Sequence, residues 1–191
     1  SLSGIDVVVG SAGDDSVTVS TNDIQTILGG SGIDEVTLSD ANTAALGISG
    51  VEVALGGTGN DRIHSSNADL TSIFIDGGLG NDSLLRGGGG ADTIFGGDGI
   101  DRLEGQDGND VLEGGAGADS LLGGNGADTL IGGAGADRMH GENGDDFIIG
   151  GNGDVVFANA GDDFIELDGS VDPGLGGAFI DGNDGFDTVS L

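Results

Sequence analysis

The sequence predicts an all-β protein in which short strands stack into a solenoid, and three observations support this prediction. Residues 87–149 divide without a gap into seven blocks of nine residues, which begin at Gly87, Gly96, Gly105, Gly114, Gly123, Gly132 and Gly141. Every block has Gly at positions one and four and Asp at position six. Position eight is always aliphatic or Met, from Ile94 to Ile148, whereas positions seven and nine are mixed. Each block is therefore one repeated structural unit.

The two parts of a block have different backbone requirements. Gly at fixed offsets marks a chain that visits positive φ or approaches another chain closely, so positions one to six predict a tight turn. The remaining three positions predict a short strand. Because successive side chains of a strand face opposite ways, position eight points inward and its neighbours point outward.

A single unit cannot be stable alone. One buried aliphatic side chain contributes roughly 1.5–3 kcal/mol, whereas ordering nine residues costs on the order of 10 kcal/mol. Stacking would also place one Asp above another, which creates a column of like charges that needs a counter-ion. Carboxylate and backbone carbonyl oxygens, without Cys or His at these positions, favour calcium over magnesium.

The nonapeptide G-G-x-G-x-D-x-U-x, in which U is large and aliphatic, resembles the calcium-binding repeat of the RTX (repeats-in-toxin, haemolysin-type) proteins. The resemblance implies a right-handed parallel β-roll in which two nonapeptides make one coil and turns line two opposite edges. It also implies that calcium lies between a turn and the turn eighteen residues later, held by position-six carboxylates and turn carbonyls.

The same turn recurs at wider spacing before the regular blocks, at Gly10–Val17, Gly29–Val36, Gly56–Ile63 and Gly77–Leu84. Intervals of 19, 27 and 21 residues separate their Asp residues. We interpret each interval as one coil with a long arch, so that the N-terminal coils carry turns on one edge only. The expected organisation is one solenoid with irregular coils at 1–76, a regular roll at 77–166 and a long final coil with a last turn at 167–191.

The candidate metal ligands are the position-six carboxylates and their equivalents: Asp15, Asp34, Asp61, Asp82, Asp92, Asp101, Asp110, Asp119, Asp128, Asp137, Asp146, Asp154, Asp163 and Asp187. We expect one edge to run through Asp15, Asp34, Asp61, Asp82, Asp101, Asp119, Asp137 and Asp154. The second edge would run from Asp92 through Asp110, Asp128, Asp146 and Asp163, with Asp187 as a further site.

The seven gaps on the first edge and four on the second predict about eleven calcium ions, which would change the net charge from −30 to −8. Two irregularities interrupt the nine-residue spacing: one extra residue near Arg86 and one missing residue before Asp154. Either could weaken a neighbouring site.

Other functional interpretations of these residues are less favoured. Position five (Asp14, Asn60, Asn81, Asn109, Asp145, Asp162) could supply additional ligands but fits solvated turn residues better. His64 and His140 occupy position nine and should face outward. No EF-hand loop is present, and the chain lacks Lys, Tyr and Cys and any recognisable catalytic motif, so we expect no enzymatic activity. A Gly-rich acidic chain could be a disordered linker, and we expect this behaviour without calcium.

The resemblance and the charge together predict a calcium-binding RTX module. It would fold outside the cell after type I secretion and stabilise a larger secreted or surface bacterial protein, with calcium and the other domains of that protein as partners. A chain of charge −30 repels nucleic acid and anionic membranes. The alternative is a structural spacer or lattice-forming module of an adhesin or surface layer, with end-to-end or lateral self-association. Glycan binding on the arches is a remote third hypothesis.

Overall fold

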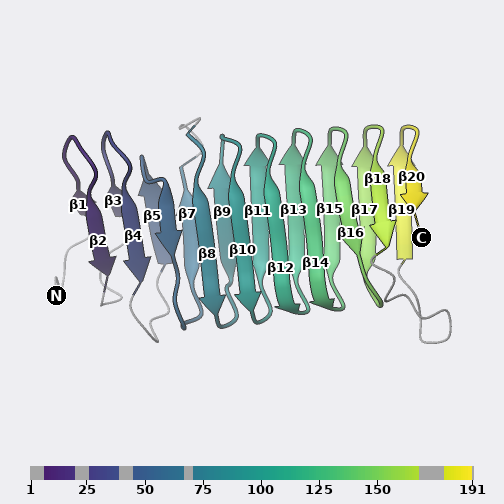
Figure 1. Cartoon of the computed structure of the whole chain (residues 1–191), viewed down its shortest axis with the longest axis horizontal. Helices are drawn as coiled ribbons and strands as arrows, with labels where there is room; N and C mark the ends of the chain where they lie inside the picture. The colour runs from purple at the N-terminus through teal and green to yellow at the C-terminus, as the bar shows by residue number, and fades with distance from the viewer. Residues whose placement is uncertain (1–6, 20–25, 39–44, 67–70, 168–178, 191) are drawn as a thin grey trace.

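The computed structural model describes residues 7–19, 26–38, 45–66, 71–167 and 179–190. In these ranges the chain forms twenty strands and no helix, and it winds as a right-handed coil along one long axis (Figure 1). This is the handedness that parallel crossover connections nearly always adopt. No helix long and apolar enough to cross a membrane is found in the described ranges.

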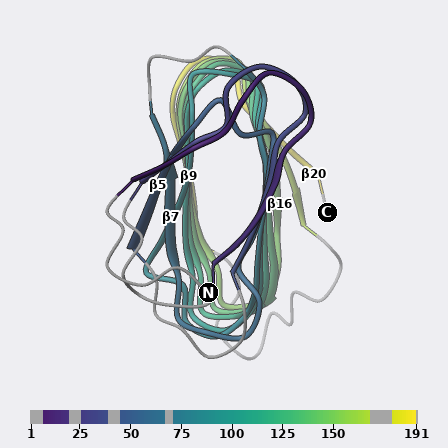
Figure 2. The same ribbon diagram turned by 90° about the vertical axis from the view of Figure 1, so that its left-hand side faces the viewer.

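The strands form two parallel sheets of ten strands each, and successive strands of the chain alternate between them (Figure 2). The odd sheet contains β1 (Val7–Val9), β3 (Thr26–Leu28), β5 (Ala45–Ser49), β7 (Arg62–Ser65), β9 (Leu84–Gly88), β11 (Arg102–Asp107), β13 (Ser120–Asn125), β15 (Arg138–Asn143), β17 (Val155–Ala160) and β19 (Phe179–Asp184). The even sheet contains β2 (Ser16–Val19), β4 (Glu35–Leu38), β6 (Val53–Leu55), β8 (Phe74–Leu79), β10 (Thr93–Asp98), β12 (Val111–Gly117), β14 (Thr129–Gly135), β16 (Phe147–Gly150), β18 (Phe164–Leu167) and β20 (Thr188–Ser190).

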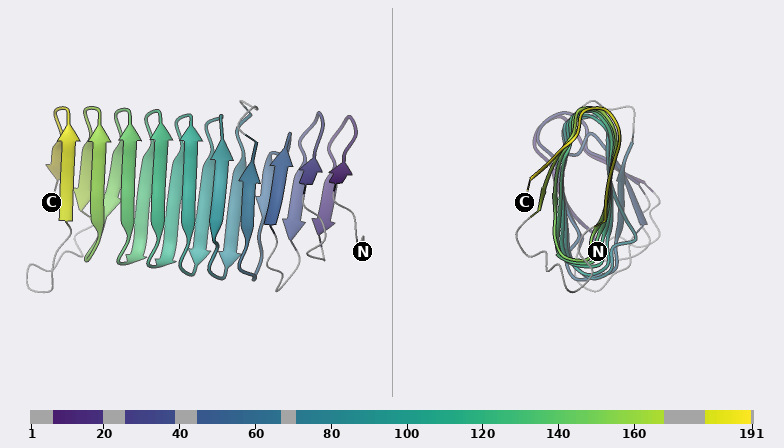
Figure 3. Two further views of the ribbon diagram at one scale, coloured as in Figure 1. Left: turned by 180° about the vertical axis from the view of Figure 1, so that it is seen from behind. Right: turned by 90° about the vertical axis from the view of Figure 1, so that its right-hand side faces the viewer.

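Each strand pairs with the strand one coil later, and both sheets run the length of the molecule (Figure 3). In the regular coils Thr93 pairs with Val111 and Ser120 pairs with Arg138. Both pairs are eighteen residues apart, so two nonapeptides make one coil. The predicted parallel β-roll is confirmed, whereas the three-part division of the chain stays a prediction.

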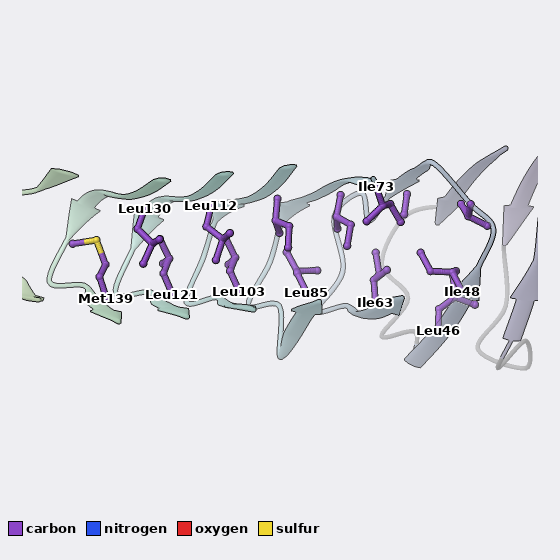
Figure 4. Packing of buried hydrophobic residues seen from close by; sticks show 14 of the residues in the cluster. Leu46, Ile48, Ile63, Ile73, Leu85, Leu103, Leu112, Leu121, Leu130 and Met139 are labelled. Atoms are coloured by element: carbon purple, nitrogen blue, oxygen red, sulfur yellow. The ribbon is translucent and has the colours of Figure 1, made fainter. Parts of the chain in front are cut away.

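The core is a stack of single aliphatic side chains between the two sheets. Position-eight residues such as Leu103, Leu112 and Leu121 are fully buried and point into the space between the sheets (Figure 4). Equivalent residues of the irregular coils, including Ile27 and Ile63, are buried equally well. The inward orientation predicted for position eight is therefore confirmed.

The interval between Asp34 and Asp61 is not one coil. It contains β4, β5 and β6, and β6 pairs with β4 while β5 pairs with β7. These three strands amount to one and a half coils, so Asp61 lies on the opposite edge from Asp34. The prediction that Asp15, Asp34 and Asp61 share one edge is therefore wrong.

Both breaks in the nine-residue spacing are absorbed locally. Leu85 pairs with Leu103, so the extra residue lies between Asp82 and Leu85, where Leu84 and Leu85 are both buried. Arg138 pairs with Val155, only seventeen residues later, because the turn before Asp154 is one residue short. Neither break interrupts the sheets.

Candidate metal sites

The fourteen candidate carboxylates stand in two columns, one along each edge of the solenoid. The odd column precedes strands of the odd sheet and contains Asp61, Asp82, Asp101, Asp119, Asp137 and Asp154. The even column precedes strands of the even sheet and contains Asp15, Asp34, Asp92, Asp110, Asp128, Asp146, Asp163 and Asp187. Asp15 and Asp34 therefore belong with Asp92, not with Asp61.

One carboxylate oxygen is held by the neighbouring coil at most column positions. In eleven Asp pairs the backbone N–H of one Asp donates to Oδ1 of the Asp one coil later. For example, Asp101 donates to Asp119 at 2.9 Å and Asp110 donates to Asp128 at 2.8 Å. These bonds fix the orientation of the eleven acceptor carboxylates, so the position of the second oxygen of each is determined by the backbone.

The second oxygen, Oδ2, is buried without a hydrogen-bond partner at ten column positions. These are Asp34, Asp82, Asp92, Asp101, Asp110, Asp119, Asp128, Asp137, Asp146 and Asp163. Their side chains are at most 2 % exposed. An unpaired buried carboxylate is strongly unfavourable, so each of these oxygens requires a proton or a cation.

Glycine at position one keeps the space around Oδ2 open. A Cβ atom built on Gly114 would lie 2.6 Å from Oδ2 of Asp119 and 2.6 Å from the carbonyl oxygen of Gly132 in the next coil. A carboxylate oxygen and a backbone carbonyl oxygen therefore border the same small space, which any side chain at Gly114 would fill. Oxygen ligands of these two kinds suit calcium, so the residues fit the ion that the repeat pattern predicts.

Backbone oxygens must complete each site. No group of three or more His, Cys, Asp or Glu side chains converges on one point anywhere in the described ranges. One or two carboxylates per site would be too few ligands for calcium, which takes six to eight oxygens. The remaining oxygens would have to be backbone carbonyls of the Gly-rich turns, which need few side chains for that role.

The electrostatics of the columns also favour a cation. Burial, together with the charges of neighbouring Asp residues, raises the pKa of Asp82, Asp110 and Asp146 to about 7. Burial raises the pKa of Asp92 and Asp119 to about 6. All four arginines of the chain lie within strands of the odd sheet, outside the turns. The protein therefore places no basic side chain where the carboxylates need one.

Two column residues differ because a backbone amide of their own turn reaches Oδ2. Gly151 donates to Oδ2 of Asp154 at 2.6 Å, and Ser11 donates to Oδ2 of Asp15 at 2.7 Å. The shortened turn thus leaves Asp154 in its column, bonded to Asp137 at 2.9 Å, but already partly satisfied. A metal at Asp154 would have to compete with this bond.

Sequence reasoning missed Glu52, which occupies an even-column position. Its Oε2 accepts the backbone N–H of Asp34 at 2.8 Å, the role that Oδ1 of Asp plays elsewhere. The available signal was its place just before a β-rich run, but the Glu side chain and the missing Gly-rich turn concealed it. The neighbouring coil has Ile73 at the same position.

Position five stabilises the stacking of turns. The side-chain oxygens of Asn81 and Asn109 accept the backbone N–H groups of Ile100 and Ala127 in the next coil, at 2.9 and 3.0 Å.

His64 and His140 are half-buried on the outer face of the odd sheet, and the ring of His140 stacks on Phe157 at 4.8 Å. Each lies within a strand, three residues after a column Asp.

The sequence pattern of the RTX calcium-binding nonapeptide repeat matches residues 2–23, 46–69, 86–121, 122–156 and 154–172, which is more than half of the chain. The matched residues include most of both columns. No curated protein matches the chain.

Proposed function

Because the chain belongs to the RTX calcium-binding nonapeptide repeat family, we propose that it is a calcium-dependent folding module of a larger secreted bacterial protein. The observation that carries this proposal is the set of ten buried Oδ2 atoms without a partner. Their number and regular stacking are what a protein would need if its folded state depended on many cations.

Asp and Gly would have different roles in holding an ion. Where Oδ1 of a column Asp accepts from the preceding coil, as in Asp119, Oδ2 is left pointing into the turn, and Gly at position one keeps that space free. A bound calcium would supply two positive charges at each site. The fourteen candidate Asp residues are proposed as ligands, with eleven Asp pairs as the proposed sites.

Without a cation the columns oppose folding. Stacked carboxylates would have to stay protonated near neutral pH or be buried as like charges, and both alternatives are unfavourable. We therefore expect an expanded chain at the low calcium concentration of the cytoplasm, a state suited to secretion. Extracellular calcium of ~10⁻⁴–10⁻³ M would fill the sites and fold the solenoid, because binding to a site that exists only in the folded state is folding free energy.

A calcium titration followed by circular dichroism and light scattering tests the proposal. The expected result is a change from disordered to β-rich, with contraction of the chain, at millimolar calcium or below. Magnesium at the same concentration serves as the control and should not produce it, since Mg²⁺ demands a stricter geometry and dehydrates reluctantly. A chain that is already β-rich in chelator, or that ignores calcium, would refute the proposal.

The second candidate is a structural spacer in an adhesin or surface layer. It is favoured by apolar side chains on the terminal strands, where Val9 is 69 % exposed and Phe179 is 55 % exposed. Sedimentation with and without calcium separates the two candidates, because a spacer that assembles should associate as calcium rises. In both cases the module is proposed to be non-catalytic.

A further inference from the structure

The even column does not contain Asp at every coil between Asp34 and Asp92. Strand register pairs Glu35 with Val53, Val53 with Phe74, and Phe74 with Thr93. The residues just before these strands therefore occupy one position in four successive coils, in the order Asp34, Glu52, Ile73 and Asp92. Two of the four are not aspartate.

The Glu52 turn is much shorter than its neighbours. The N–H of Gly29 donates to the carbonyl of Ser49 at 2.9 Å, which places Gly50 beside Gly29. Four residues separate Gly29 from Asp34, but only Val51 separates Gly50 from Glu52. This corner lacks three residues of the usual turn and their carbonyls. The longer side chain of Glu52 nevertheless reaches the N–H of Asp34 at 2.8 Å.

Ile73 ends the series of carboxylates. Its side chain is 4 % exposed and belongs to the hydrophobic core, and its N–H donates to Oδ1 of Asp92 at 2.9 Å. The hydrogen-bond ladder therefore starts afresh at Asp92, because the coil before it has Ile73 rather than a carboxylate at the even-column position. Asp61 and the odd column lie on the other edge, so no described carboxylate bridges the two parts of the even column.

We propose that Asp15, Asp34 and Glu52 form a short metal-binding ladder, closed by Glu52, which fills and folds separately from the two long ladders. This inference rests on the proposed calcium-binding function. The buried Oδ2 of Asp34, which has no partner, is the atom that needs the ion, and Glu52 would supply the second carboxylate. In a solenoid each coil interacts only with its neighbours, so a coil with Ile73 in place of an even-edge carboxylate interrupts the even-edge ladder between Glu52 and Asp92.

Residue-resolved amide hydrogen exchange on the full chain, measured across a calcium titration, tests the proposal. Amides of β2 and β4 report on the short ladder, and those of β12 and β14 report on the long ladders. The short ladder has fewer neighbours and should require about tenfold more calcium, within the range over which ligand number tunes such sites. Two separate midpoints are therefore expected.

Two matched variants show which ladder gives rise to which of the two calcium midpoints. Glu52→Gln removes the charge but keeps an amide oxygen for the N–H of Asp34, and it should raise the β2 and β4 midpoint about tenfold without moving the β12 and β14 midpoint. Asp128→Asn makes the same kind of change in the long even-column ladder, where Oδ1 accepts the N–H of Asp110. It should raise the β12 and β14 midpoint without moving the β2 and β4 midpoint.

The outcomes separate this inference from the proposed function. One shared midpoint for all four strands, or a Glu52→Gln variant that shifts both groups or neither, overturns the separate ladder while calcium-dependent folding stands. If no strand gains protection at any calcium concentration, both the ladder and the calcium-dependent function are wrong. Distinct midpoints with the expected pair of shifts establish Glu52 as a metal-site residue.

Discussion

The irregular coils at residues 7–66 and the regular coils at 77–166 differ in their turns but not in their core. In both regions the strands after β1 contribute buried apolar side chains, such as Ile27 in the first and Leu112 in the second, and β1 contributes the half-buried Val8. The regular coils repeat every eighteen residues, whereas Val7 pairs with Thr26 after nineteen residues and Thr26 with Gly47 after twenty-one. Stacking of the coils thus depends on the buried core and not on a fixed coil length. The Gly-Asp turn appears only where carboxylates are stacked.

The sharpest test of the role of these turns compares repeat position four inside the stack with the same position in the first coil. Gly117 and Gly13 both occupy position four with positive φ, 149° and 111°. A Cβ on Gly117 would overlap the carbonyl oxygen of Gly99, whereas a Cβ on Gly13 would meet nothing within 4 Å. With saturating calcium, we expect Gly117→Ala to lower the free energy of unfolding by more than about 3 kcal/mol, from backbone strain plus overpacking.

Gly13→Ala is the matched control, because it carries the backbone strain without the clash. Its expected effect is about 1–2 kcal/mol. Urea unfolding of both variants measures the difference. Equal losses would mean that cross-coil contact does not explain glycine at position four.

Core substitutions should have a larger effect at a fully buried position inside the stack than at a half-buried position in the first coil. Leu121 is fully buried between Leu103 and Met139 in register, so Leu121→Ala should lower the free energy of unfolding by about 2–5 kcal/mol. Val17 is half-buried against the core of the irregular coils, and Val17→Ala should lower it by about 1 kcal/mol. Denaturation in calcium measures both, and a larger effect at Val17 would contradict the ordering.

The regular coils could be predicted from the sequence because one short period encodes both turn and core. Asp at position six and an aliphatic residue at position eight recur every nine residues, and this fixes the coil length and the buried face of each strand. The hydrogen-bonded partner of each Asp follows from the same period. Burial of Leu112 and Leu130, and their pairing in register, confirm this prediction.

The irregular coils could not be predicted equally well because a corner need not contain the repeat motif. Gly50, at φ 58°, turns the chain with only Val51 before Glu52, so the strand at Ala45–Ser49 had no turn signal to separate it. The alternation of Leu46 and Ile48, both buried, was the one available clue. Because this half coil was not predicted, Asp61 was assigned to the wrong edge.

The pH dependence of the calcium-free chain tests the electrostatics of the regular coils. Burial raises the pKa of Asp82, Asp110 and Asp146 from 3.8 to about 7, so the folded state binds protons more tightly than the unfolded state. Their proton-linked stabilisation is fully present below about pH 4 and is lost as the pH rises to about 7. In chelator, we expect β structure by circular dichroism to increase on acidification from pH 8 to pH 4.

Saturating calcium should remove this dependence at neutral pH, because the ion takes the place of the protons. Below about pH 4 the protons should instead displace calcium. Calcium-free β structure that increases with pH would contradict the raised pKa values and the burial that causes them.

The smallest expected difference concerns position five, where the two regions should behave alike. The Oδ1 atom of Asn60 accepts the N–H of Asn81 at 2.7 Å, and Oδ1 of Asn109 accepts the N–H of Ala127 at 3.0 Å. Each is one exposed cross-coil hydrogen bond, so Asn60→Ala and Asn109→Ala should each lower the free energy of unfolding by about 0.5–1.5 kcal/mol.

Calcium stoichiometry, counted by native mass spectrometry, determines whether these residues do more than join turns. A residue that only bonds the next coil can be removed without losing an ion, and the count should stay that of the unsubstituted chain in both variants. Loss of one ion from Asn109→Ala alone would make position five a ligand in the regular coils. The carboxylate columns would then be only part of the site, and the two regions would differ in their ligands as well as in their turns.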